Sequence, residues 1–291
     1  MACKLEVSGR THLVCLLGNP TEHSLSPAMH NLSFELLGID AVYVCFDVQN
    51  EDLGSIVTAF RVMESWDGFN VTMPCKQTII PYLDELDAAA ELIGAVNVVK
   101  KSDGKVVGFN TDGKGFIVNL AKHGVQVPGS RMVLIGPGGA GSAIMAQAAL
   151  DGVSHIDVFA RAGGASHKAA LGLAERVMAA TDCSIALHDL ADSSKMGSCI
   201  QDADILVNAT SVGMGEQNGE TPVPAELVKT GMAVADVIYH PRETRFIRDA
   251  KARGCLTVPG LGMLIEQAAV GESIWYDAQM PIEEIERRLF S

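Results

Sequence analysis

A lone lysine follows a short apolar segment in the stretch NVTMPCKQ, residues 70–77. Residues 68–73 are typical of a strand, and Pro74 both ends that strand and suits the first turn of a helix. Lys76 is therefore expected at a strand-to-helix junction, where side chains tend to face a cleft. The alternative is a solvated surface lysine, which is the usual place for this residue type.

The segment GPGGAG carries Gly136, Gly138 and Gly141 in G-x-G-x-x-G spacing. An apolar strand, 132–135, precedes it, an alanine-rich helix follows, and a second strand ends near residue 160. In this context the glycines allow a tight turn and let the backbone approach a pyrophosphate, whose charge then lies at the helix N-terminus. We therefore predict a dinucleotide-binding loop rather than a simple tight turn.

The residue at the tip of the second strand usually selects the cofactor, because an acid there binds the ribose diol of NAD and a base binds the 2′-phosphate of NADP. This chain has Arg161 at the tip, between two alanines, and Asp157 lies inside the strand. Arg161 therefore favours NADP. The next base is Lys168, so NAD remains the alternative.

The elements that must position the glycine loop form a regular alternation of strands and helices. Apolar runs of strand length occur at 132–135, 155–160, 184–189, 204–210, 233–239 and 255–259, and helical or loop segments separate them. This alternation predicts a parallel, doubly wound sheet with right-handed crossovers.

Residues 12–110 also alternate between strand and helix patterns. A helix is expected at 27–37, with Ser26 as its N-cap and Pro27 at its first helical position. The two runs on either side of residues 102–104 predict a β-hairpin. The last thirty residues contain two helical stretches, 264–276 and 282–289, which we expect to pack back on this first part of the chain.

The composition fits a globular chain of about two domains, since 48% of the 291 residues are hydrophobic. The net charge is -13, with -8 in residues 1–112, -1 in 113–259 and -4 in 260–291, and no basic block is present. Nucleic acids and anionic membranes are therefore not expected as partners. Without a long apolar run or a signal-peptide pattern, a cytoplasmic location is expected.

Metal binding and disulfides are not indicated by the seven cysteines, which form no C-x-x-C pair and have no accompanying histidine spacing. Most of them are expected to be small core residues. His23 and His30 flank two serines without metal-ligand spacing, so we interpret both histidines as structural.

Eight segments, in this order along nearly the whole chain, together resemble the shikimate dehydrogenase family, including its quinate/shikimate branch: GNPTEHSLSPAMHN (18–31), NVTMPCK (70–76), GAVNVV (94–99), NTDGKG (110–115), GPGGAG (136–141), NATSVGM (208–214), DVIYHP (236–241) and GLGMLIEQAA (260–269). The resemblance implies an α/β fold with an N-terminal α/β substrate domain, 1–111 and 262–291, and a Rossmann-like, doubly wound dinucleotide-binding domain, 112–261. The C-terminal helices would return to the substrate domain.

The resemblance also implies a catalytic pair, Lys76 and Asp112, at the substrate hydroxyl that becomes a ketone. Hydride transfer to or from a nicotinamide needs a group that takes the hydroxyl proton and returns it. Lys76 is expected in that role, and Asp112 is expected to orient the lysine and to accept a hydrogen bond from the substrate. The alternative for Asp112 is a helix N-cap, and it could serve both purposes.

Further ligands follow from the same resemblance. Ser24 and Ser26 would donate to the substrate carboxylate, with Tyr239 at the same end, although Ser26 could be a helix cap only. Ring hydroxyls are assigned to Thr72, Asn97 and Gln267, polar side chains that are each more often structural when taken singly. The expected cofactor-binding residues are Gly136, Gly138, Gly139, Ala140, Gly141, Arg161, Thr210, Ser211, Met214, Gly260 and Met263.

The sequence departs from the family pattern near the cofactor, and this leaves the choice between NADP and NAD open. Pro137 removes one backbone N–H from the glycine loop, and Ala160 and Ala165 stand where NADP-dependent members often carry Asn and a base. The expected reaction is the reversible reduction of 3-dehydroshikimate with NADPH, in aromatic amino-acid precursor synthesis. The alternatives are quinate oxidation with NAD, another two-domain dehydrogenase, and a non-catalytic nucleotide sensor. The apolar early strands could support a homodimer.

Overall fold

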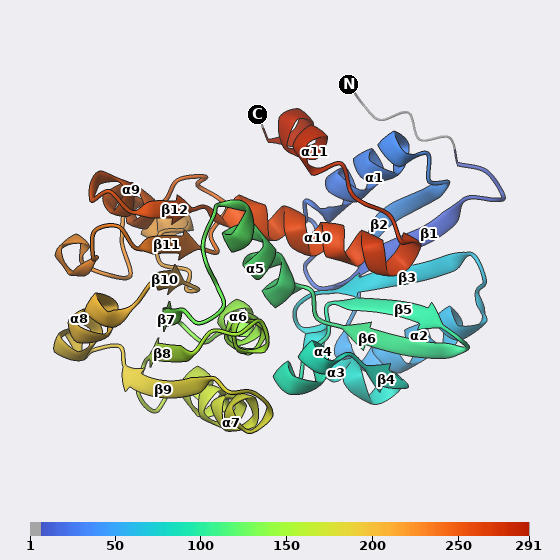
Figure 1. Cartoon of the computed structure of the whole chain (residues 1–291). Coiled ribbons are helices and arrows are strands. Elements are labelled where there is room, and N and C mark those ends of the chain that lie inside the picture. Colours follow the sequence, from blue (N-terminus) through green and yellow to red (C-terminus); the bar gives the residue numbers. More distant parts are fainter. Residues whose placement is uncertain (1–6, 291) are drawn as a thin grey trace. The chain divides into compact units, whose positions relative to one another are not determined.

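The computed structural model describes residues 7–290, and in it the chain divides into two compact units (Figure 1). The first unit comprises the described residues up to Thr111 and from Gln267 onward, and the second unit comprises Asp112–Glu266. The chain passes between the units after Thr111 and again within helix α10, Gly260–Tyr276. Substrate binding by the first domain and dinucleotide binding by the second stay predictions.

The first unit contains a six-stranded mixed sheet in the order β2-β1-β3-β5-β6-β4. Its strands are β1 (His12–Gly18), β2 (Ala41–Asp47), β3 (Trp66–Val71), β4 (Glu85–Leu86), β5 (Val98–Ser102) and β6 (Lys105–Phe109). β1 pairs in parallel with β2 and β3, whereas β5 pairs antiparallel with both β3 and β6. The predicted hairpin is confirmed, and Asp103 (φ 50°) and Gly104 (φ 77°) adopt the left-handed conformation that its tight turn requires.

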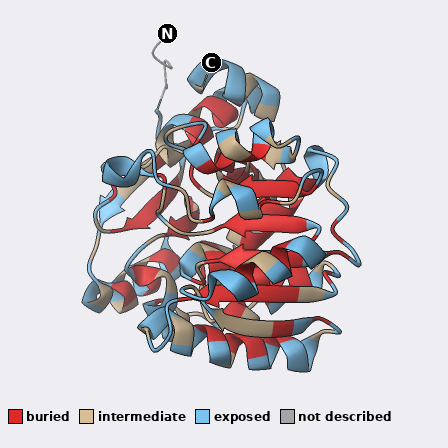
Figure 2. Cartoon of the chain, turned by 90° about the vertical axis from the view of Figure 1, so that its left-hand side faces the viewer, coloured by how far each residue is buried: buried red, intermediate tan, exposed pale blue. Residues whose placement is uncertain are grey.

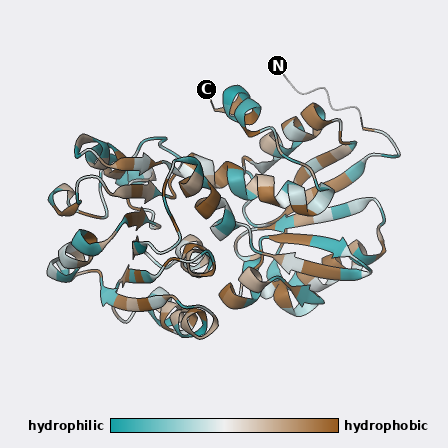
Figure 3. Cartoon of the chain, viewed as in Figure 1, coloured by the Kyte–Doolittle hydropathy of each residue, from teal (hydrophilic) through white to brown (hydrophobic). Residues whose placement is uncertain are grey.

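The helices of this unit are α1 (Ser26–Leu37), α2 (Leu53–Val62), α3 (Cys75–Thr78), α4 (Ala88–Ile93), the C-terminal part of α10, and α11 (Ile282–Leu289), with two short 3₁₀ turns, η1 (Asn50–Asp52) and η2 (Ile80–Tyr82). The C-terminal segment belongs to this unit, as expected. Figure 3 shows that α11 is mostly hydrophilic, and Ile285 is its buried residue.

The prediction that Ser26 is the N-cap of α1 is wrong. Leu25 is the N-cap and has no side-chain capping bond, and Ser26 is the first helical residue. The Ser26 backbone N–H instead donates to the Ser24 hydroxyl over 3.2 Å. Ser24 therefore satisfies one of the unpaired amides at the start of the helix, which is the task that we had assigned to Ser26.

Both faces of the first sheet are covered, and alternate residues of β1 show this. Cys15 and Leu17 pack in one buried cluster with Phe60 of α2, whereas Val14 and Leu16 pack in another with Phe34 of α1 and Trp275 of α10. A strand buried on both faces needs apolar residues at every position, which explains why β1 is a continuous apolar run.

The second unit is a six-stranded parallel sheet in the order β12-β11-β10-β7-β8-β9, so the predicted doubly wound sheet is confirmed. Its strands are β7 (Arg131–Ile135), β8 (His155–Ala160), β9 (Ser184–Asp189), β10 (Ile205–Asn208), β11 (Ala233–Asp236) and β12 (Leu256–Val258). Its helices are α5 (Asp112–Lys122), α6 (Gly139–Leu150), α7 (Ala165–Ala180), α8 (Ser193–Asp202), α9 (Arg245–Ala252) and the start of α10, and the 3₁₀ turns are η3 (Gly215–Gln217) and η4 (Ala225–Leu227).

The four central strands of this second sheet, β7, β8, β10 and β11, are almost entirely buried (Figure 2), whereas the outer strands β9 and β12 are partly exposed. The chain runs outward from β7 through β8 to β9, and then returns to the other side of β7 to build β10, β11 and β12. The order of strands therefore reverses between β7 and β10. In open parallel sheets, ligands bind beyond the carboxyl ends of the strands at this kind of reversal.

A helix that crosses a membrane must be both long and apolar. Among the described residues, no helix combines the length and the apolar character needed to cross a membrane.

Candidate active site

The glycine loop joins β7 to α6 at the point where the strand order reverses. Gly136 has a φ of 89°, and a Cβ on it would lie 2.4 Å from Cγ2 of Thr210. A Cβ on Gly141 would lie 2.1 Å from the carbonyl oxygen of Gly136. Both positions therefore require glycine, because backbone or side-chain atoms approach too closely for any larger residue.

The N-terminus of α6 is open beyond this loop. Its N-cap, Gly138, supplies no side-chain hydrogen bond, and Gly138 and Gly139 are exposed, with no atom within 4 Å of a Cβ built on either residue. Ala140 is half-buried and Gly141 is buried. The first amide groups of α6 therefore face an open space, which is the arrangement that binds a phosphate at a helix N-terminus.

The loop after β10 is fixed by a buried asparagine. The Asn208 amide oxygen accepts hydrogen bonds from the backbone N–H (3.0 Å) and the hydroxyl (2.7 Å) of Thr210, and its Nδ2 donates to the carbonyl oxygen of Val212 over 3.2 Å. Thr210 is half-buried, while Ser211 and Met214 are exposed. The loop thus presents Ser211 and Met214 beside the glycine loop that Thr210 contacts.

Asn208 is itself positioned by a buried carboxyl group. Its Nδ2 donates to Oδ1 of Asp236 over 3.1 Å, and the Thr244 hydroxyl donates to Oδ2 over 2.7 Å. Burial raises the pKa of Asp236 to about 6, against the opposing effect of these hydrogen bonds. We predicted no roles for Asn208, Asp236 and Thr244. The sequence signal that could have found the first two is a polar residue at the end of an apolar strand, since Asn208 ends β10 and Asp236 ends β11.

The tip of β8 presents Arg161, which is exposed, directly after Ala160. Asp157 is buried inside β8, and its two carboxylate oxygens contact the His188 and His155 rings over 2.6 Å and 3.2 Å. Asp157 is therefore engaged within the sheet and does not serve as an acid at the strand tip. The described tip of β8 offers a base for the cofactor and no carboxylate of its own.

Gly260 and Met263 lie at the start of α10 in the second unit. A Cβ on Gly260 would lie 2.5 Å from the backbone carbon of Val237, just after β11, and Met263 is 8% exposed. Tyr239 follows the same strand end and is 40% exposed. The structure therefore places these three residues around the segment that follows β11.

The predicted substrate ligands of the first unit come together because its sheet contains both parallel and antiparallel strand pairs. β1 and β3 are parallel, so Gly18 and Val71 end at the same edge of the sheet. β5 runs antiparallel to β3, and Asn97, just before β5, accepts a hydrogen bond on its carbonyl oxygen from the Val71 backbone N–H over 2.9 Å. The loops after β1 and β3 and the start of β5 therefore meet at one edge.

Asn97 is the centre of this edge and is 3% exposed. Its Nδ2 donates to the Thr111 hydroxyl (2.9 Å) and to Oε1 of Gln267 (3.5 Å), and its Oδ1 accepts from the Thr111 backbone N–H (2.8 Å). The Thr111 hydroxyl in turn donates to the carbonyl oxygen of Gln267 over 3.0 Å. The N-terminal sheet and α10 are thus joined by side chains that can present both donors and acceptors.

A second chain of hydrogen bonds leads from Asn97 to the serines. Nδ2 of Asn70 donates to the Asn97 carbonyl oxygen over 2.9 Å, and the Tyr43 hydroxyl donates to Oδ1 of Asn70 over 2.6 Å. The Ser26 side chain lies close to the Tyr43 hydroxyl. Burial raises the pKa of Tyr43, and the contact with Ser26 lowers it against this larger effect. Ser24, in the loop after β1, and Ser26, the first residue of α1, are both half-buried, so they lie at the same edge as Asn97.

Lys76 lies in α3, directly after β3, and is half-buried rather than fully solvated. The backbone N–H of Val96 donates to the Lys76 carbonyl oxygen over 2.8 Å, which fixes α3 beside Asn97. Thr72 packs so closely on the end of β1 that a Cβ on Gly18 would lie 2.3 Å from its Cγ2. The strand-to-helix junction expected for Lys76 is present.

The comparisons with known proteins agree with these motifs. A family model described as the shikimate dehydrogenase substrate binding domain matches residues 16–99. A shikimate dehydrogenase (NADP(+)) of Listeria monocytogenes is 41% identical over 285 residues, which cover 98% of this chain and 97% of the relative.

The chain belongs to the shikimate dehydrogenase family. It is therefore an oxidoreductase. The crystal structure of shikimate 5-dehydrogenase from Listeria monocytogenes in complex with shikimate and NAD matches with a TM-score of 0.95 and 41% identity, covering 98% of each chain. Quinate dehydrogenase from Corynebacterium glutamicum in complex with NAD matches with a TM-score of 0.84 and 28% identity, over 95% of this chain and 98% of that one.

Asp112, the other half of the catalytic pair predicted for this family, is the first residue of α5 and is half-buried. It follows directly on Thr111, which is bonded to Asn97. A Cβ on Gly113 would lie 2.3 Å from the carbonyl oxygen of Ala143, so the start of α5 packs closely on α6. The functional pairing of Asp112 with Lys76 stays a prediction.

Proposed function

We propose that this chain catalyses the reversible, NADP-dependent reduction of 3-dehydroshikimate to shikimate, a step in the synthesis of aromatic amino-acid precursors. One observation carries the proposal: Ser24, Ser26, Thr72, Lys76, Asn97 and Gln267 all lie along one edge of the first sheet. The relatives named shikimate dehydrogenase (NADP(+)), at 41% identity over nearly the whole chain, support the same function.

The proposal assigns the proton transfer to Lys76. Reduction of the ketone by hydride leaves an alkoxide that needs a proton, and oxidation requires removal of the same proton, so one amine can serve both directions. Asp112 is proposed to orient the lysine and to accept a hydrogen bond from the substrate. Ser24, Ser26 and Tyr239 would bind the substrate carboxylate, while Thr72, Asn97 and Gln267 would bind the ring hydroxyls.

The second unit is proposed to bind the dinucleotide. The open N-terminus of α6 would bind the pyrophosphate, with Gly136, Gly138, Gly139, Ala140 and Gly141 around it. Thr210, Ser211, Met214, Gly260 and Met263 are proposed near the nicotinamide and its ribose. Arg161 would bind the 2′-phosphate, because it is exposed at the tip of β8 while Asp157 is held inside the strand.

Replacing Lys76 by alanine tests the assignment of the proton transfer. Lys76→Ala should lower kcat by roughly 10²–10⁴-fold, the usual contribution of a general acid or base. Shikimate affinity should change far less, because removal of a group that acts in the transition state affects turnover more than ground-state binding. Lys105→Ala is the control, since Lys105 lies on the surface of the same unit, where it pairs with Glu85. Unchanged turnover, or equal losses of turnover and affinity, would contradict the assignment.

The choice of substrate and cofactor is tested by four initial rates, measured by nicotinamide absorbance with shikimate or quinate and with NADP or NAD. The proposal expects shikimate with NADP to be fastest. Faster oxidation of quinate with NAD would replace it with the activity named for the Corynebacterium relative. The absence of all four activities would favour a nucleotide sensor. A homodimer and a cytoplasmic location stay predictions.

A further inference from the structure

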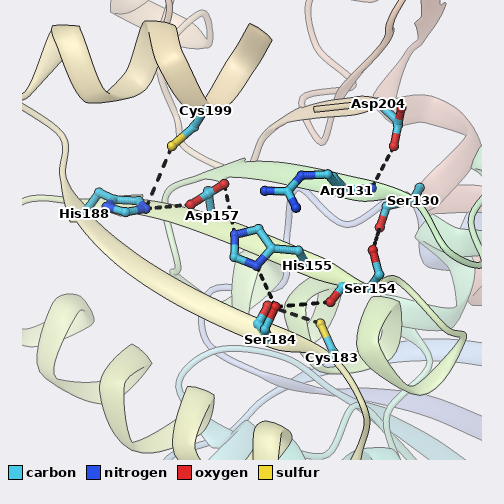
Figure 4. Close-up of polar contacts among 10 residues, drawn as sticks. All are labelled: Ser130, Arg131, Ser154, His155, Asp157, Cys183, Ser184, His188, Cys199 and Asp204. Carbon is cyan, nitrogen blue, oxygen red and sulfur yellow. Dashed lines mark hydrogen bonds and ion pairs between the residues drawn. The ribbon is translucent and has the colours of Figure 1, made fainter. Parts of the chain in front are cut away.

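Four side chains of metal-ligating types, His155, Asp157, His188 and Cys199, lie near one another in the second unit (Figure 4). Asp157 lies in β8, His188 in β9 and Cys199 in α8, and their ligand atoms all lie within 4.8 Å of one another. Nε2 of His188 is 2.6 Å from Oδ1 of Asp157 and 4.0 Å from Sγ of Cys199. Nε2 of His155, in β8, is 3.2 Å from Oδ2 of the same carboxylate.

The strand register brings these residues together. His155 and Asp157 are two positions apart in β8, so their side chains point to the same face of the sheet. His188 is paired with Phe159, which belongs to the same alternating set of β8, and it therefore shares that face. Cys199 is 5% exposed and packs with Phe159 in the cluster that α8 forms against the sheet. The four side chains thus converge between two neighbouring strands and one helix.

His155 has a partner on its second ring nitrogen. Its Nδ1 lies 2.6 Å from the Ser184 hydroxyl, which also lies 3.3 Å from the carbonyl oxygen of Ser154. Metal-bound histidines commonly have such a partner on the ring nitrogen that does not bind the metal. Ser184 would therefore hold the His155 ring with Nε2 directed at Asp157.

Cys199 contributes a sulfur from the helix that covers this face of the sheet. It is 5% exposed, and its Sγ lies 4.0 Å from Nε2 of His188. A metal is bound by the thiolate, so binding of a cation here would release the thiol proton.

We propose that Asp157, His155, His188 and Cys199 bind one zinc ion per chain. One sulfur, two imidazole nitrogens and one carboxylate oxygen form a donor set that Zn²⁺ accepts in tetrahedral geometry. In such a site, nitrogen and oxygen ligands lie about 3.3 Å apart, and nitrogen and sulfur about 3.5 Å apart. The distances from His188 to Asp157 and to Cys199, 2.6 Å and 4.0 Å, lie on either side of those values, so side-chain shifts below 1 Å adjust these two pairs. His155 approaches the other carboxylate oxygen, Oδ2, at 3.2 Å and is not one of the three residues whose ligand atoms all lie within 4.8 Å of one another. It is therefore the ligand that must move to complete the site.

Four protein ligands leave no position for a substrate, so the zinc has a structural role. It joins β8, β9 and α8, which are otherwise held by packing and strand pairing. Zinc that binds only the folded state stabilises the second unit. Above the dissociation constant, the free energy of unfolding rises with the logarithm of the zinc concentration. This inference does not depend on the reaction proposed above.

Metal titration of the purified, tag-free chain tests the site. After treatment with a chelator, the protein should bind one equivalent of Zn²⁺, measured by competition with a chromophoric chelator, and its unfolding temperature should rise. Co²⁺ in its place should give the visible bands of a tetrahedral site together with a thiolate-to-metal charge-transfer band. Saturation at one equivalent with no thiolate band would overturn the proposed ligand set.

Matched serine variants locate the site. Cys199→Ser should abolish the thiolate band and weaken Zn²⁺ binding by more than 100-fold, beyond the 10- to 100-fold loss typical of partners outside the ligand set. Cys183→Ser is the control, because Cys183 is equally buried at 4%, lies beside Ser184 and directs its sulfur at the Ser184 carbonyl oxygen. Ser184→Ala should weaken binding by about 10- to 100-fold, since it removes the partner of His155.

Two outcomes would overturn the proposal. One is the absence of saturable Zn²⁺ binding to the wild-type chain, which would leave a hydrogen-bonded cluster without a metal. The other is equal Zn²⁺ affinity in the Cys199→Ser and Cys183→Ser variants. If Cys199→Ser does not fold, the wild-type Co²⁺ spectrum and a His188→Gln variant decide the matter, because both report on the same ion independently.

Discussion

Asp236 should make the stability of the second unit depend on pH. Its side chain is 1% exposed and accepts hydrogen bonds from Asn208, Thr244 and the backbone N–H of Ile238. Burial nevertheless raises its pKa from 3.8 to about 6. Each pKa unit corresponds to about 1.4 kcal/mol, so ionising this carboxyl group costs the folded state about 3 kcal/mol more than it costs the unfolded chain.

The direction follows from proton binding. Between about pH 4 and pH 6 the folded state holds a proton on Asp236 that the unfolded chain has already lost. Raising the pH through this window therefore destabilises the folded unit, and the loss reaches about 3 kcal/mol by about pH 7. Asp236→Asn removes the titrating group. The difference in unfolding free energy, wild type minus variant, should fall by that amount from pH 4 to pH 7.

The chain offers a way to follow each unit separately. Its two tryptophans, Trp66 and Trp275, both belong to the first unit, so tryptophan fluorescence follows that unit while far-ultraviolet circular dichroism follows both. Urea titrations at several pH values should show the changed pH dependence in the dichroism. Asp182→Asn, at an exposed position of the second unit, is the control for the loss of one carboxylate. Parallel pH profiles for wild type and Asp236→Asn would refute the reasoning.

Two further substitutions test the packing around the candidate site. Glu272→Ala should destabilise the first unit by about 3–5 kcal/mol, because it leaves the buried His30 ring (2.8 Å) and Ser33 hydroxyl (2.6 Å) without their carboxylate. Tryptophan fluorescence in urea measures this loss of stability. Glu272→Gln should cost less, and equal losses for the two variants would contradict the role of the hydrogen bonds. Gly141→Ala should weaken NADPH binding in a fluorescence titration, because its Cβ would lie 2.1 Å from the Gly136 carbonyl oxygen. Gly172→Ala in α7, where a Cβ meets only the end of Arg176 at 3.7 Å, should leave NADPH affinity unchanged.

The strands were predictable because both sheets are covered on two faces. Residues 132–135 are all 0% exposed, so the strand appears in the sequence as an unbroken apolar run. The start of α10 was less predictable: we expected it at residue 264, and it begins at Gly260. Glycines weaken a helix signal, but a Cβ on Gly260 or Gly262 would meet Val237 or Asn119 within 2.5 Å. Close packing therefore decides the boundary, and no local pattern records it.

The residue types of the candidate site could be predicted from the sequence, but the hydrogen bonds that join these residues could not. The motifs singled out Asn97 and Gln267, but Thr111, Asn70 and Tyr43, which bond them into one edge, carried no signal of their own. Their contacts arise because β5 runs antiparallel to β3, and this register is a property of the whole sheet. The proposed zinc ligands were missed for the same reason. His188 is 31 residues from Asp157 and 11 from Cys199. Strand pairing brings His188 to Asp157, and the packing of α8 on the sheet brings Cys199 to both.

The two buried aspartates of the second unit show how partners, rather than residue type, decide what a carboxyl group can do. Burial raises the pKa of both. Around Asp236 every donor is neutral, namely an amide, a hydroxyl and a backbone N–H, so burial prevails and the group holds two loops together by hydrogen bonds. Around Asp157 the donors are two imidazoles, and the pKa is lowered instead. Two carboxyl groups of the same residue type thus take different parts: Asp157 lies in a cluster with two imidazoles and a thiol, whereas Asp236 anchors the loop that follows β10.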